Sequence, residues 1–70
     1  MGTIGMMVEE NKADLVEIVC NDYRRCLPCH KAYFIAAYKG TDVWNTAAKK
    51  YKLEEYTGNN LGETILRIEL

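Results

Sequence analysis

The sequence predicts a small all-α domain, and three stretches of helical periodicity are the reason. Polar side chains recur every three or four positions within residues 9–25, and apolar side chains do so within residues 41–52 and 61–70. A chain of 70 residues makes one small domain. We therefore expect residues 1–70 to form a single three-helix unit. A core this small usually needs additional stabilisation from a metal, a cofactor, a disulfide or a partner subunit.

The first predicted helix begins near Glu9-Glu10-Asn11 and runs for about four turns towards Cys26. Acidic residues suit a helix N-terminus, and asparagine is a good cap. The polar stripe consists of Glu10, Asp14, Glu17, Asn21 and Arg24, and the opposite face of Leu15, Val16, Val19, Cys20 and Tyr23. A strand is the alternative for residues 16–19, because three of these four residues are β-branched.

The remaining elements are predicted from helix caps, turn residues and the spacing of apolar residues. Residues 31–40 are aromatic and apolar, and we expect them to wrap around whatever the cysteines hold. A second helix begins at Gly40-Thr41, with Thr41 as its N-cap and three lysines towards its end. Residues 57–60 form a turn cluster, and a third helix follows with Leu61, Ile65 and Ile68 on one face. Residues 65–70 have a strand as their alternative.

The segment Cys26-Leu27-Pro28-Cys29-His30 carries the strongest chemical signal. Cys-x-x-Cys-His is the attachment pattern for a c-type haem. The two thiols can form thioether bonds to the haem vinyl groups, and the adjacent imidazole can bind iron as the proximal ligand. Because His30 is the only histidine of the chain, no second histidine can complete the coordination. The pattern predicts one covalent haem c held through Cys26 and Cys29.

With this motif between a helix and the aromatic segment, the chain resembles a small monohaem class I c-type cytochrome. Residues 43–52 resemble the middle helix of that family, and residues 61–68 resemble the short helix that follows it. The resemblance implies a domain wrapped around its haem and one-electron transfer to redox partner proteins, without enzymatic chemistry. The expected haem-packing aromatic residues are Tyr33, Phe34, Tyr38, Trp44 and Tyr51.

The family places its distal methionine after the haem motif, whereas Met1, Met6 and Met7 all precede it here. The Gly-Pro step that supports the proximal histidine is also missing. Residues 3–19 resemble the family's methionine loop and last helix, moved to the N-terminus. Two hypotheses follow: a circular permutation in which Met6 or Met7 binds the iron of its own haem, or donation of residues 1–10 to a neighbouring subunit in a homo-oligomer or filament. An open sixth position and a purely packing role for the methionines remain as alternatives.

Two other readings of the cysteines stay open. The first is a thiol–disulfide redox module using Cys26 and Cys29, with residues 15–19 as a strand leading to the pair and residues 31–39 as the following helix. A helix N-terminus would then activate Cys26. The second is a structural zinc site using Cys20, Cys26, Cys29 and His30. Because Cys29 and His30 are adjacent in the chain, they cannot easily bind one tetrahedral ion together. Without a partner, Cys20 is a small buried apolar residue or forms an intermolecular disulfide.

The composition and the motif limit the partners and the cellular compartment that we expect for the protein. A net charge of −1 gives no reason to expect binding to nucleic acid. No apolar run is long enough for a transmembrane helix. Covalent haem attachment takes place outside the cytoplasm, so we expect an exported protein in the periplasm or outside the cell. Residues 1–7 are too short and too uncharged for a signal peptide.

Overall fold

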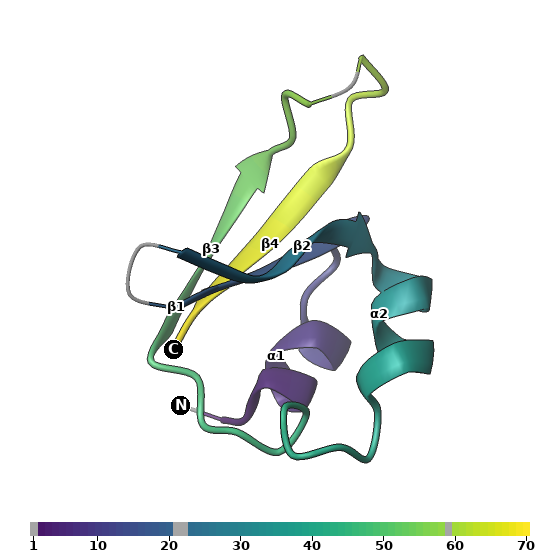
Figure 1. Cartoon of the computed structure of the whole chain (residues 1–70). Coiled ribbons are helices and arrows are strands. Elements are labelled where there is room, and N and C mark those ends of the chain that lie inside the picture. The colour runs from purple at the N-terminus through teal and green to yellow at the C-terminus, as the bar shows by residue number, and fades with distance from the viewer. Residues whose placement is uncertain (1, 21–22, 59) are drawn as a thin grey trace.

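The structure is a computed structural model that describes residues 2–20, 23–58 and 60–70, with residues 23–25 described by their backbone alone. Across these residues a mixed four-stranded sheet carries two short helices on one face (Figure 1). The strands are β1 (Leu15–Cys20), β2 (Tyr23–His30), β3 (Lys50–Glu55) and β4 (Thr64–Glu69), and the helices are α1 (Ile4–Glu10) and α2 (Lys31–Tyr38). The prediction of an all-α three-helix domain is therefore wrong.

The strand order is β2-β1-β4-β3, so the chain crosses from β2 over α2 to the opposite edge before it returns to the centre. β1 pairs antiparallel with β2 and parallel with β4, and β4 pairs antiparallel with β3. Parallel neighbours need a long crossover connection, which here runs through β2, α2 and β3. In Figure 1 the hairpin of β3 and β4 extends beyond the two helices.

The first predicted helix is replaced by β1 and the beginning of β2. Val16 and Ile18 lie opposite Leu66 and Ile68 and are fully buried on the helix-bearing face, as β-branched residues in a central strand often are. Glu17 lies between them on the other face, where it is 1% exposed and Arg67 Nε donates to its carboxylate at 2.5 Å. Of the expected polar stripe, Asn21 and the side chain of Arg24 lie outside the described residues.

The second predicted helix is a series of turns followed by β3. Thr41 Oγ1 does accept the Trp44 N–H at 3.4 Å, as an N-cap would, and the Thr46 hydroxyl donates to the Asp42 carbonyl at 2.7 Å, but residues 42–45 form turns and no helix follows. The third predicted helix is wrong as well. Its strand alternative is confirmed, because residues 64–69 form β4. The turn cluster lies between β3 and β4, and its Asn59 is outside the described residues.

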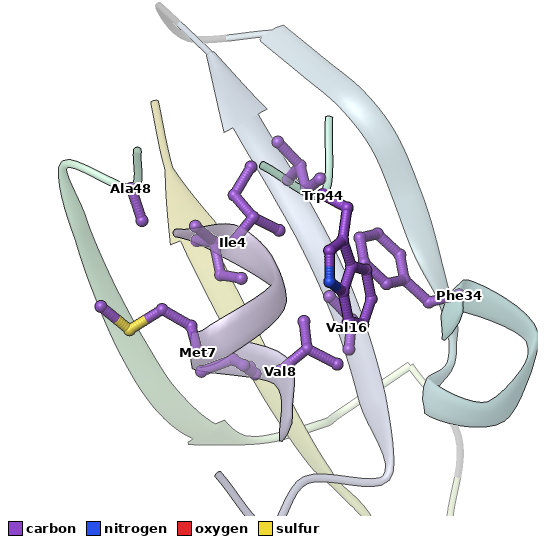
Figure 2. Packing of buried hydrophobic residues seen from close by; sticks show 10 residues of the cluster. Ile4, Met7, Val8, Val16, Phe34, Trp44 and Ala48 are labelled. Atoms are coloured by element: carbon purple, nitrogen blue, oxygen red, sulfur yellow. The ribbon is translucent and has the colours of Figure 1, made fainter. Parts of the chain in front are cut away.

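The core lies between the helix-bearing face of the sheet and α1. Figure 2 shows Ile4 and Val8 of α1 gathered with Val16, Phe34 and Trp44. The Thr3 side chain caps α1 by accepting the Met6 N–H at 3.3 Å. The buried residues of α1 thus pack in the core of their own chain, and donation of residues 1–10 to a neighbouring subunit stays a prediction.

Membrane insertion through a helix has no support in the part of the chain that the structure describes. Neither of its helices is long and apolar enough to cross a bilayer.

Candidate functional site

The two cysteines of the motif lie on β2, an edge strand, and a bulge decides where they point. Cys29 is opposite Val16 and Cys26 is opposite Ile18, so three steps along β2 match two steps along β1. In a regular strand, residues three apart face opposite sides. The extra residue of the bulge removes this difference, and both cysteines face the helices. Pro28 lies within the bulge, where its missing N–H costs no regular ladder bond.

The two thiols are close enough to interact and differ in their surroundings. The Cys29 thiol is half-buried and donates weakly to the Val16 carbonyl, with 3.9 Å between Sγ and oxygen. Burial, the charge of Cys26 and a hydrogen bond with Cys26 raise the pKa of Cys29 from 9.0 to about 11. The Cys26 thiol is in a more exposed position and donates to the Leu27 carbonyl at 3.4 Å. Both side chains pack against the edge of the core, and both are reduced.

Tyr38, in the last turn of α2, completes this group. The negative charge of Cys26, partial burial and a hydrogen bond with Cys26 raise the pKa of the Tyr38 hydroxyl. Its ring is held by Phe34, with 4.8 Å between the ring centroids. The site therefore consists of two thiols and one phenol, which we call the thiol cluster (Cys26, Cys29 and Tyr38). All three belong to β2 and α2, which follow each other directly in the chain.

His30 does not join the thiol cluster. It follows Cys29 directly in a strand, so the two side chains diverge. The imidazole is 67% exposed, and its Nδ1 lies 3.9 Å from a carboxylate oxygen of Glu63. It lines an open pocket of about 380 Å³ together with Ala13, Asp14, Lys31, Ala32, Ile35 and Glu63.

The positions of these side chains do not fit a covalent haem. Haem attachment needs both thiols at the porphyrin edge and the imidazole beneath the same ring. Here the thiols face the core beside Tyr38, whereas the imidazole faces the pocket at Glu63. The haem therefore stays a prediction from the sequence motif.

The other predicted haem contacts are dispersed. Met7 is buried in the core at 6% exposure, whereas Met6 is 50% exposed. Figure 2 shows Met7 on the side of Ala48, away from Phe34. Among the aromatic residues, Phe34, Tyr38 and Trp44 come together, and Phe34 and Trp44 have ring centroids 6.3 Å apart. Tyr33 and Tyr51 are 70% and 45% exposed and do not join them.

The zinc reading gains no support from the geometry. Within residues 2–20, 23–58 and 60–70, no three histidine, cysteine, aspartate or glutamate side chains are placed to hold a metal ion. Cys20, at the end of β1, is half-buried and opposite Tyr23, and its intermolecular disulfide stays a prediction.

The local structure expected for a thiol redox module is confirmed in part. Residues 15–20 form a strand and residues 31–38 form a helix. The cysteines, however, lie on the next strand, and α2 begins only after His30, so Cys26 does not lie at the N-terminus of α2. Sequence reasoning missed the bulge and the contact of Tyr38 with the thiols. Pro28, within the strand itself, was the available signal for the bulge.

Comparison of the chain with protein-family models, curated proteins and solved structures finds no match.

Proposed function

We propose that the protein is a thiol–disulfide redox module whose reactive pair is Cys26 and Cys29. One observation carries the proposal: the bulge in β2 places both thiols on one face of an edge strand, close enough to interact. A pair of partly accessible thiols with two residues between them has the spacing of Cys-x-x-Cys redox motifs. Tyr38 adds a polar group beside them.

The chemistry assigns different roles to the two thiols. Cys26, the more exposed one, attacks a sulfur of a partner disulfide as thiolate and forms a mixed disulfide, while the departing partner sulfur takes up a proton. Cys29 then loses its proton and attacks Cys26 Sγ, which releases the second partner sulfur. The protein dithiol becomes a disulfide and the partner disulfide becomes a dithiol, so two electrons and two protons are transferred.

The raised pKa of Cys29 suits the resolving role. A thiol that keeps its proton at neutral pH does not compete for the partner disulfide. It reacts after Cys26 because the mixed disulfide holds an electrophilic sulfur next to it. We therefore expect Cys26 to be alkylated faster than Cys29 in the reduced protein at neutral pH.

A redox titration with thiol trapping tests the proposal. The protein is equilibrated in mixtures of reduced and oxidised dithiothreitol, and free thiols are labelled with a maleimide that increases the mass. We expect one two-electron transition that disappears in Cys26→Ser and in Cys29→Ser. Cys20→Ser is the matched control and should retain it. A pair that stays reduced in fully oxidised buffer would overturn the proposal.

A visible spectrum distinguishes this function from the haem prediction. The protein is produced in an export-competent host with haem maturation, purified, and examined oxidised and then reduced with dithionite. The redox module should be colourless, with both thiols open to alkylation. A Soret band that survives denaturation would show that the thiols are consumed in thioether bonds, and electron transfer by haem would replace thiol exchange.

A further inference from the structure

The two edges of the sheet differ in how well they can accept another strand. β2 carries two register shifts and Pro28, features that disturb edge pairing. β3, at the other edge, pairs with β4 over six consecutive positions without a shift. Among the strands that the structure describes, none lies beyond β3. Its residues are exposed, except for Glu54, which is half-buried.

The backbone of β3 has unused hydrogen-bonding groups on its outer side. The Tyr56 N–H donates to the Glu63 carbonyl at 2.8 Å, in the same register as the β3–β4 ladder. Hydrogen-bonded and non-hydrogen-bonded pairs alternate along antiparallel strands. Lys50, Lys52 and Glu54 therefore direct their N–H and C=O groups to β4. Tyr51, Leu53 and Glu55 direct theirs away from the sheet.

The side chains of β3 are arranged for pairing with an identical strand. Tyr51 and Leu53 lie opposite the core residues Ile68 and Leu66, hence on the helix-bearing face, yet they are 45% and 47% exposed. On the other face, Lys50 and Lys52 precede Glu54. A strand with cations in its first half and anions in its second half is complementary to itself when it runs antiparallel.

We propose that β3 is a homodimer interface, in which the β3 strands of two copies pair antiparallel around a two-fold axis and make one continuous eight-stranded sheet. The axis is perpendicular to the sheet, so directly opposite residues share a face. Two pairing registers place the two-fold axis near the middle of β3, one at Lys52 and one at Leu53. With Lys52 on the axis, two lysines meet, which is unfavourable. With Leu53 on the axis, Leu53 meets its own copy and Lys52 meets the second copy's Glu54 on both sides.

The Leu53 register also uses the free backbone groups. The outward groups of Leu53 pair with those of the second copy's Leu53, and those of Tyr51 pair with the second copy's Glu55. Tyr51 and the second copy's Leu53 become diagonal neighbours on the helix-bearing face, which covers both exposed apolar side chains. A second copy therefore satisfies the outward backbone groups of β3 and covers its apolar side chains. It also gives Lys52 and Glu54, which pair with each other at 3.3 Å within the chain, a second partner of opposite charge.

Charge exchange between two variants tests this interface. Sedimentation equilibrium of the reduced protein should show a concentration-dependent dimer. Lys52→Glu places glutamate opposite glutamate, Glu54→Lys places lysine opposite lysine, and each variant alone should be monomeric. An equimolar mixture should dimerise again, because both charge pairs are then complementary. Lys12→Glu makes the same charge change outside β3 and should remain a dimer.

Two additional measurements keep the test independent of folding defects. Glu54→Lys removes a partner of Arg67, and both charge variants break the Lys52–Glu54 ion pair within the chain, so the far-ultraviolet circular dichroism of each is compared with that of the unmodified chain. Leu53→Lys leaves that ion pair in place and should also be monomeric. Amide exchange should be slow at Tyr51, Leu53 and Glu55 only in the dimer, but slow at Lys52 in both states. A monomer at every concentration, or a dimer that persists in Lys52→Glu and Leu53→Lys, would overturn the proposal.

Discussion

At the scale of single residues, the proposed redox function gives the hydroxyl of Tyr38 a role. This hydroxyl can donate a hydrogen bond to a thiolate at Cys26, and their interaction is what raises the pKa of Tyr38 most. Phe34 fixes the ring from the same helix, one turn earlier. In the proposed redox module, Tyr38 is therefore the positioning residue of the thiol cluster.

The variant Tyr38→Phe keeps the ring packing and removes only this donor. We expect alkylation of Cys26 at neutral pH to slow, because the thiolate loses a hydrogen-bond donor. Tyr33→Phe, at a residue that is 70% exposed, is the matched control. Rates are followed with iodoacetamide and mass spectrometry. An unchanged alkylation rate in Tyr38→Phe would remove tyrosine from the proposed mechanism.

The raised pKa of Cys29 predicts a loss of stability at high pH. The folded chain keeps the Cys29 proton up to about pH 11, whereas the unfolded chain releases it near the ordinary value of 9.0. The contribution is thus fully present below pH 9 and is lost as the pH rises through the folded value. Urea unfolding of the reduced protein should show this decline. Cys29→Ser and the oxidised protein should lack it, and equal slopes in all three would contradict the assignment.

At the scale of the elements, helical periodicity is visible in the sequence but does not decide the fold. Glu17 occupies a helix-like polar position, yet it is buried because Arg67, fifty residues later, donates to it. A local pattern cannot reveal such a partner. The β-branched composition of residues 16–19 was the better indicator there, and a strand was the alternative both for this segment and for residues 65–70. The haem contacts were expected from residues 31–40 surrounding the group that the cysteines hold. That expectation did not include a bulged strand at the cysteines themselves.

The segment that replaces the second helix has a role that periodicity did not indicate. Trp44 lies on Gly5 of α1, and a Cβ at Gly5 would overlap the indole ring. The Gly5 N–H also donates to the Trp44 carbonyl at 2.9 Å. The close contact of this turn region with α1 therefore depends on the absence of a side chain at Gly5.

Gly5→Ala should for this reason destabilise the protein by about 1–3 kcal/mol, the usual cost of overpacking a core, despite the better helix propensity of alanine. Met6→Ala, in the same helix but at a side chain that is 50% exposed, should have a much smaller effect. Thermal unfolding followed by Trp44 fluorescence measures both. A Gly5→Ala protein as stable as the unmodified chain would show that the indole can move aside at little cost.

At the scale of the whole molecule, the thiol cluster and the proposed dimer interface occupy opposite edges of one sheet. β1 and β4 lie between β2 and β3, so three strand spacings of about 4.8 Å separate the two edges. Dimerisation through β3 thus leaves the thiols accessible at both ends of an eight-stranded sheet. Closing the disulfide changes β2 and α2, neither of which contacts the second copy in this arrangement.

The two proposed activities should therefore be independent. We expect the dimer dissociation constant from sedimentation to be the same for the protein in reduced and in oxidised dithiothreitol. The redox equilibrium should likewise be the same for the dimer and for the monomeric Leu53→Lys variant. Cys20→Ser is used throughout, so that no intermolecular disulfide contributes. A dimer that tightens or weakens on oxidation would contradict this independence and show that the sheet transmits the state of β2 through β1 and β4. The redox equilibrium would then also differ between dimer and monomer, because linkage requires the effect to be reciprocal.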